Sequence, residues 1–162
     1  MAKASKAGAT TLTAPSDREI VITRVFDAPR RLIFEAWTNP EHLPHWMLGP
    51  GGWTMPVCEI HLRPGGAWHF SWRHSDGTEM EMRGVYQEIV PPERLVSTES
   101  WGCDWPETLN TLTLSEEEGK TTITNTVLYP SKEARDAALQ TGMKEGMSLS
   151  FDRLAEYLRN MT

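Results

Sequence analysis

Alternating apolar and polar positions dominate the chain after residue 17 and predict a protein built mainly of β-strands. The first such segment, residues 19–26, is rich in β-branched side chains and is predicted to be a strand. Six further strand candidates, separated by short turns rich in glycine and proline, span residues 53–61, 66–74, 79–90, 93–101, 107–115 and 120–128. Close spacing of this kind indicates an antiparallel meander.

Two short helices are predicted between the first strand and the meander. Pro29 suits the first position of a helix, because its missing N–H would be unpaired there, and this helix runs to about Thr38. Asn39 suits the cap of a second short helix over residues 40–46, which Pro44 limits.

One long helix is predicted at the end of the chain, from residue 131 to about 160. It carries a stripe of apolar residues at spacings of three and four: Met143, Met147, Phe151, Leu154 and Leu158. Gly142 and Gly146 lie beside this stripe. Because glycine disfavours a helix interior, they indicate a break, a kink or a site of close packing.

The order of these elements predicts an α+β fold, in which a curved seven-stranded antiparallel sheet wraps around the long C-terminal helix. Residues 18–160 are predicted to form this single domain, and residues 1–17, in which Leu12 is the one large apolar side chain after Met1, are predicted to be a flexible tail. A helix about 10 Å wide does not fill a broad concave sheet, so we expect a cavity between the two.

The charge balance limits the classes of partner that we expect the protein to bind. The chain has 16 Lys and Arg against 22 Asp and Glu, a net charge of −6, and such an acidic chain without a basic cluster is a poor binder of nucleic acid. No apolar run reaches the roughly 18 residues that span a bilayer. The N-terminus lacks the apolar core of a secretory signal, so we expect a cytoplasmic protein with Cys58 and Cys103 reduced.

Seven tryptophans and eight methionines supply many bulky apolar side chains. Trp68, Phe70 and Trp72 alternate along one strand, so they share a face and predict the aromatic wall of a ligand cavity, with ordinary packed core as the alternative. The candidate ligand-binding residues are Trp37, Trp46, Trp68, Phe70, Trp72, Met82, Tyr86, Trp101, Met143, Met147 and Phe151. If the other face of this strand meets the helix, the lining residues are instead Ala67, His69, Ser71 and Arg73.

The pairing register of the next strand stays open at this stage, because a shift of one residue exchanges its two faces. Either Glu81 or Met82 therefore lies opposite Trp72. A buried Glu81 or Arg83 would be a polar anchor for a ligand, whereas an exposed ion pair between them would be structural.

No catalytic set is recognisable, and the catalytic residues stay unassigned. The five histidines do not predict three converging ligands, so we expect neither a metal nor a cofactor. Glu35 and Glu41 would serve as acid or base only if desolvated, and solvated helix faces are the alternative. His69 is the best single candidate for proton transfer, although it points away from Trp68 and Phe70.

Several segments together resemble a known family. They are Arg24–Pro29 leading into Phe34–Leu43, then Trp46, the turn Arg63–Gly66, the hairpin Gly84–Ile89 with Pro91–Val96, and the closing segment Gly146–Leu158. Over about residues 18–160 the chain resembles the START and birch-pollen-allergen-like superfamily, also called SRPBCC. Within it, the motifs are most similar to the branch named after the activator of the ATPase of heat-shock protein ninety.

The resemblance implies the helix-grip fold and is weak for function, because this superfamily includes lipid carriers, cyclases, dioxygenase domains and co-chaperone domains. Three hypotheses follow: binding of a small hydrophobic or aromatic molecule, a co-chaperone-like contact with a heat-shock ATPase, or a cyclase- or hydrolase-like enzyme. The first is favoured, because no second binding module and no catalytic motif is found. The sequence does not decide whether the protein forms a homodimer.

Overall fold

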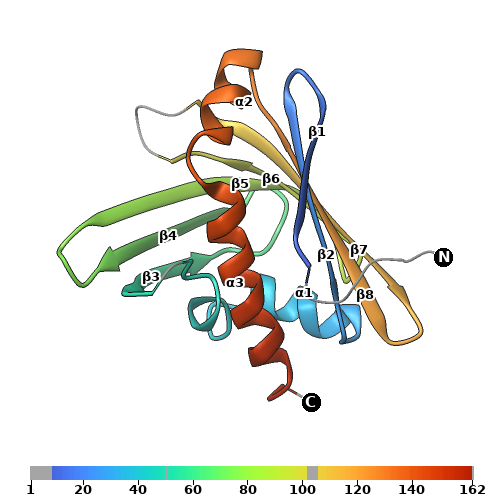
Figure 1. Ribbon diagram of the computed structural model, residues 1–162. Helices are drawn as coiled ribbons and strands as arrows, with labels where there is room; N and C mark the ends of the chain where they lie inside the picture. The colour runs from blue at the N-terminus through green and yellow to red at the C-terminus, as the bar shows by residue number, and fades with distance from the viewer. Residues whose placement is uncertain (1–8, 50, 102–105, 162) are drawn as a thin grey trace.

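The computed structural model describes residues 9–49, 51–101 and 106–161, which form one curved antiparallel sheet and a C-terminal helix that crosses its concave side (Figure 1). The strands are β1 Thr11–Ser16, β2 Glu19–Phe26, β3 Trp53–Ile60, β4 Ala67–His74, β5 Glu79–Val90, β6 Arg94–Glu99, β7 Thr108–Glu117 and β8 Lys120–Leu128. The helices are α1 Arg30–Thr38, the short 3₁₀ helix η1 Leu43–His45, α2 Lys132–Leu139 and α3 Met143–Leu158.

The sheet order is β1-β2-β8-β7-β6-β5-β4-β3, with every neighbouring pair antiparallel. The predicted α+β helix-grip fold is therefore confirmed. The predicted number of strands was wrong, since the described sheet has eight strands rather than seven. The seven predicted strands are all present, and their ends agree with the prediction to within two residues.

The extra strand, β1, lies inside the segment predicted to be a flexible tail, and that prediction was wrong over Thr11–Ser16. Three links hold the strand in place: β1 pairs with β2, Leu12 packs against the core, and the Ser16 carbonyl accepts a hydrogen bond from buried Arg135 of α2. Composition missed the strand because an edge strand gains stability from its backbone ladder as well as from its own side chains. Residues 1–8 lie outside the described part.

The second predicted helix, residues 40–46, is a single 3₁₀ turn over Leu43–His45. The predicted cap at Asn39 was wrong, because this helix begins after His42 and no side chain caps it. The side-chain oxygen of Asn39 instead accepts from the Glu41 N–H at 2.8 Å, in the turn before the helix. The two prolines in this segment, Pro40 and Pro44, have no N–H to donate, which keeps the helical segment short.

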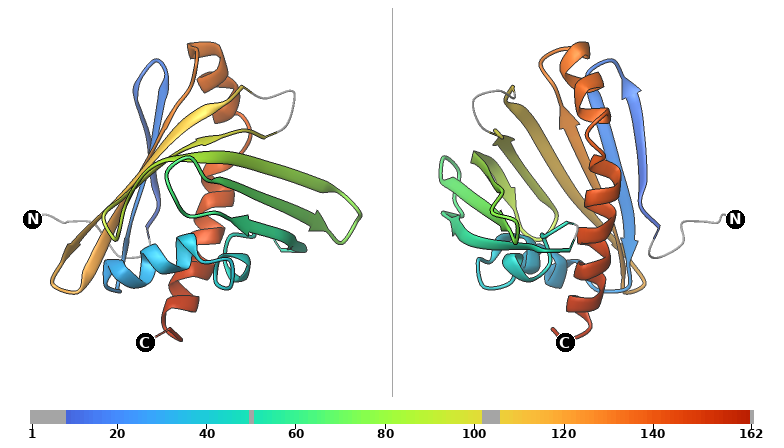
Figure 2. Two further views of the ribbon diagram at one scale, coloured as in Figure 1. Left: turned by 180° about the vertical axis from the view of Figure 1, so that it is seen from behind. Right: turned by 60° about the vertical axis from the view of Figure 1, so that its left-hand side comes forward.

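The predicted closing helix is two helices. The helical conformation is interrupted between α2 and α3 at Gly142, whose φ of +76° is left-handed and cannot continue a right-handed helix. In Figure 2, α3 then runs along the concave side of the sheet, and its C-terminal half lies next to α1 and η1. Arg24, buried on β2, fixes this helix through an ion pair with Asp152 at 2.8 Å.

The register of β4 and β5 settles which faces meet. Trp72 pairs with Met80, so the prediction of Glu81 or Met82 opposite it was wrong. Phe70 pairs with Met82, so both belong to the same face, and both are buried. Glu81 pairs with Ser71 on the opposite face, where it forms an exposed ion pair with Arg83 at 3.0 Å. The buried polar anchor considered for Glu81 and Arg83 was therefore wrong, and the aromatic face of β4 is the concave one.

Candidate functional site

The middle strands of the sheet place a set of polar side chains on the concave face. On β6, Leu95, Ser97 and Glu99 alternate with residues of the other face, and Leu95 is buried in the core. Their partners on β7 include Asn110 opposite Ser97 and Thr108 opposite Glu99. Antiparallel partners share a face, so these polar residues form a patch that is turned toward α3.

The two halves of α3 meet this concave face differently. Phe151 and Leu154, in the C-terminal half, are 0% exposed. Met143 and Met147, in the N-terminal half, keep partial exposure, and a Cβ placed on Gly146 would meet no atom within 4 Å. The inward-facing Ser97, Glu99 and Asn110 are also only half-buried. The sheet and helix are therefore sealed at one end and open to solvent at the other. We call this second region the open end.

Aromatic rings line the concave face of β4. The centroids of Trp68 and Phe70 lie 4.8 Å apart, those of Phe70 and Trp72 lie 6.1 Å apart, and Trp101 stacks on Trp72 at 5.5 Å. Trp72 donates its indole N–H to the Met47 carbonyl at 2.8 Å, which fixes the position of its ring. The chain of rings is thus continuous from buried Trp68 to Trp101, which is 38% exposed.

The predicted ligand-binding residues fall into two groups. Those beside the open end or on the adjoining concave surface are Trp68, Phe70, Trp72, Met82, Tyr86, Trp101, Met143 and Met147. Trp37, Trp46 and Phe151 pack together at the sealed end, where the centroids of Trp37 and Trp46 lie 4.8 Å apart. Trp46 is 0% exposed and donates to the Ala36 carbonyl at 3.0 Å, so Trp46 and Phe151 belong to the core, and half-buried Trp37 packs against it.

Glu99 is the acidic residue of the polar patch. Its Oε1 accepts a hydrogen bond from the Trp101 indole N–H at 3.1 Å. Burial raises the pKa of the Glu99 carboxyl to about 7, although hydrogen bonds from Trp101 and Asn110 act in the opposite direction. Nearby Tyr129 has its pKa raised to about 12 by burial and by the charge of Glu99. Glu99 therefore exchanges a proton near neutral pH.

Trp68 carries an unpaired polar group. Its Nε1 is buried and has no hydrogen-bond partner, unlike the indole nitrogens of Trp46 and Trp72. Buried donors in native proteins are nearly always satisfied by protein, water or ligand. The site thus contains one donor that the chain itself leaves free.

Sequence reasoning missed Ser97, Glu99, Thr108 and Asn110. The alternation of residues 95–99 places Ser97 and Glu99 on the same face as Leu95, which was a usable signal. It was insufficient, because the inward direction of that face depends on pairing with β5 and β7.

A second polar cluster joins α1, η1 and α3 at the sealed end. His42 contacts Glu35 through Nε2 at 3.1 Å and the Tyr157 hydroxyl through Nδ1 at 2.6 Å, and the ring of His45 stacks on Tyr157. Glu35 is more than half exposed, as expected for a solvated helix face. Among the described residues no three acidic, histidine or cysteine side chains are arranged to hold a metal ion.

The remaining candidates for chemistry lie elsewhere. His69 lies between Glu59 and Glu81 on the face opposite the aromatic rings, with its Nε2 3.3 Å from Glu81. Burial raises the pKa of the Cys58 thiol to about 11, which makes it a poor nucleophile. Cys103 lies outside the described residues.

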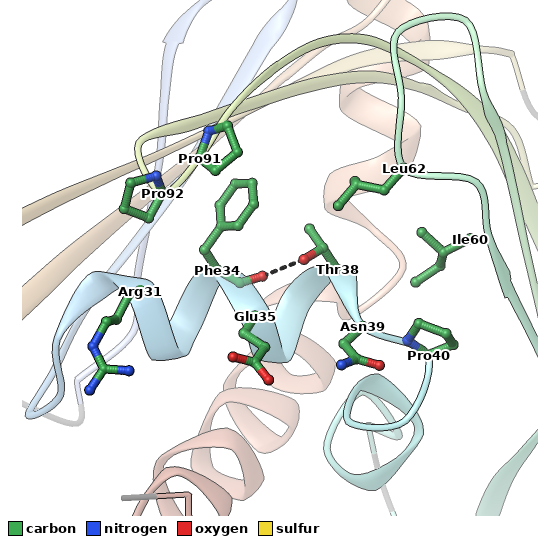
Figure 3. Close-up of a pocket in the computed structure, with 10 residues that line it drawn as sticks. All are labelled: Arg31, Phe34, Glu35, Thr38, Asn39, Pro40, Ile60, Leu62, Pro91 and Pro92. Atoms are coloured by element: carbon green, nitrogen blue, oxygen red, sulfur yellow. Dashed lines mark hydrogen bonds between the residues drawn. The ribbon is translucent and has the colours of Figure 1, made fainter.

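A groove on the outer side of α1 is separate from the open end (Figure 3). It has a volume of about 610 Å³, and its apolar lining includes Phe34, Leu62, Pro91 and Pro92. The charged ends of Arg31 and Glu35 point away from the two prolines.

Comparison with known proteins identifies the family. The model of the family described as "Activator of Hsp90 ATPase homolog 1-like protein" matches residues 27–159. The chain belongs to this family. No curated protein matches it. No helix in the described part of this family member has the length and apolar character needed to cross a bilayer.

Solved structures agree with this assignment. A crystal structure of a protein from Rhodobacter sphaeroides is 28% identical, with a TM-score of 0.88, and the match covers 95% of this chain and 100% of that one. A protein from Mycobacterium smegmatis is 24% identical, with coverage of 91% and 96% and a TM-score of 0.81. An AHSA1-like protein from Aeromonas hydrophila is 17% identical, with coverage of 87% and 93% and a TM-score of 0.68. The last two support the fold alone.

Proposed function

We propose that the protein binds a small hydrophobic or aromatic molecule at the open end, between the concave face of the sheet and the N-terminal half of α3. The observation that carries this proposal is the contrast along α3. Phe151 and Leu154 are fully buried, whereas Met143 and Met147 of α3 and the inward-facing Ser97, Glu99 and Asn110 keep contact with solvent. Binding sites combine apolar walls with a few converging polar groups, which is the composition found here.

Titration with Nile red, a neutral hydrophobic dye, tests the proposal. The native protein should shift the emission of the dye to shorter wavelength and saturate. Met147→Trp, which places a large ring at the open end, should weaken binding by about tenfold or more because it occupies the same space. Leu149→Trp is the matched control, since Leu149 is 43% exposed and lies outside the site.

Equal affinity of both variants for Nile red would show that the dye binds outside the open end. No binding to the wild type would mean that the open end does not accept apolar molecules, and the proposal would fall. Native mass spectrometry of freshly purified protein provides a second readout, because a carried ligand adds a defined mass.

A contact with a heat-shock ATPase is the second candidate, supported by the family description and by the apolar groove beside α1. Stimulation of a purified Hsp90-type ATPase by the protein would favour it. Leu62→Asp should abolish that stimulation, because Leu62 is an exposed apolar residue of the groove. An enzyme is the third candidate, with Glu99 as the proton donor to a bound substrate, and turnover of a ligand found by mass spectrometry tests it.

A further inference from the structure

The unpaired indole N–H of Trp68 defines one requirement for a ligand of the open end. Trp68 is 5% exposed and its Nε1 has no partner, so its donor meets neither protein nor bulk solvent. A ligand atom that accepts a hydrogen bond there removes the cost of the unpaired donor. A purely hydrocarbon ligand does not.

Glu99 lies in the same row of the sheet as this donor. Tyr86 pairs with Ser97 and Arg83 with Ser100, and this register puts Gly84 opposite Glu99. Trp68 pairs with Gly84 from the other side.

Gly84 makes room for the indole ring. A Cβ placed on Gly84 would lie 2.6 Å from Trp68 Cε2, the atom bonded to Nε1. The ring of Trp68 therefore lies over Gly84 of β5, the strand between β4 and the strand that carries Glu99.

The hydrogen bonds of the Glu99 carboxyl leave part of it available. Oε1 accepts from Trp101, and Asn110 is a second donor to the carboxyl. Near neutral pH the group also carries a proton for part of the time, because burial raises its pKa to about 7. Thr108 and Asn110 on β7 are the uncharged polar neighbours. Within the described part of the chain, Tyr129 is the titratable group that senses Glu99, and it stays neutral because its pKa is about 12.

We infer that the ligand carries a carbonyl oxygen, which accepts one hydrogen bond from the Trp68 indole N–H and a second from the protonated Glu99 carboxyl. This inference rests on the proposed function and names the chemical class of the ligand: an aromatic or apolar ketone, aldehyde, ester or amide. Its apolar body lies against Trp72, Trp101 and the methionines of α3. An organic cation would leave the Trp68 donor unpaired, and a carboxylate would be repelled wherever Glu99 is ionised.

The test uses three probes with one naphthalene body: 2-acetylnaphthalene, 2-isopropenylnaphthalene and 1-(2-naphthyl)ethylamine. The first carries a carbonyl, the second is nearly isosteric without oxygen, and the third is a cation. Affinities are measured by quenching of tryptophan fluorescence at pH 6 and pH 8.5. At pH 6 the ketone should bind about tenfold tighter than the hydrocarbon, and at pH 8.5 this preference should shrink because ionised Glu99 no longer donates.

Two variants separate the donors. Trp68→Phe removes the free N–H and should reduce the ratio of ketone to hydrocarbon affinity, whereas Trp72→Phe should keep it, because the Trp72 N–H is already paired with Met47. Glu99→Gln keeps a neutral donor at every pH, so its ketone preference should persist and no longer depend on pH. The infrared stretch of ¹³C-labelled ketone bound to wild type should also lie at lower frequency at pH 6 than at pH 8.5.

The outcomes are distinct. Equal binding of ketone and hydrocarbon at both pH values overturns the carbonyl inference and leaves the binding site standing. Tightest binding of the amine, increasing with pH, also overturns the inference and indicates a cation site. Failure of all three probes and of Nile red overturns the proposed function itself.

Discussion

Single residues decide the chemistry of the open end, and Glu99 is the one whose charge state varies near neutral pH. In the unfolded chain the pKa of its carboxyl is near the ordinary value of 4.5, whereas in the folded protein burial raises the pKa to about 7. Between these two values the folded state binds more protons than the unfolded state. The free energy of unfolding therefore decreases as the pH rises from 4.5 to 7 on account of this residue.

Glu99→Gln should remove that contribution. We expect the stability of the variant relative to wild type to increase by up to roughly 3 kcal/mol between pH 4.5 and pH 7.5, because one pKa unit corresponds to about 1.4 kcal/mol. Urea unfolding of both proteins at several pH values measures this difference. A stability difference that stays constant with pH would show that the Glu99 carboxyl is well solvated in the folded state.

At the scale of elements, the break between α2 and α3 determines how the last helix meets the sheet. The cap Ser131 accepts from the Ala134 N–H at 3.1 Å and starts α2, which ends after Leu139. Gly142 then adopts a left-handed conformation, and α3 starts in a new direction. Its apolar stripe consequently seals the sheet at Phe151 and Leu154 but not at Met143.

The two glycines of this region should respond to alanine with opposite signs. Gly142→Ala should cost about 1–2 kcal/mol, because φ of +76° brings a Cβ close to the backbone. Gly146→Ala should stabilise the protein by about 0.5–1 kcal/mol, because Gly146 lies inside α3 and a Cβ there has open space. Urea unfolding of both variants gives the comparison, and equal effects would contradict the assigned break.

For the whole molecule, β1 closes one edge of the sheet and links it to the C-terminal helices. The strand pairs with β2, and Arg135 of α2 reaches the carbonyl of Ser16. Leu12 adds an apolar contact with the core. The first strand therefore belongs to the folded domain and contributes to its stability.

Deletion of residues 1–17 should lower the melting temperature by several degrees, because at this size each kcal/mol lost corresponds to about 2–4 °C. The physical cause is loss of the β1–β2 ladder together with the Arg135 contact. Differential scanning calorimetry measures the change. An unaltered melting temperature would mean that β1 contributes no net stability.

The sequence by itself determined the larger part of the fold. Seven strands, the first helix and the apolar stripe of the last helix follow from local periodicity, because alternation and 3.6-residue spacing are properties of each segment alone. The shared face of Trp68, Phe70 and Trp72 was fixed in the same way. The family that the sequence motifs indicated is confirmed by the match to the family model.

Only the tertiary structure decided the rest. The register between β4 and β5 placed Met82 and not Glu81 on the aromatic face, and register depends on two strands at once. The inward direction of Ser97 and Glu99 depends on three strands. The strand β1 depends on a partner ladder and on a distant arginine, and neither is visible in the composition of its own residues. Local periodicity therefore fixed the elements, whereas contacts between elements fixed the polar patch and its unpaired donor.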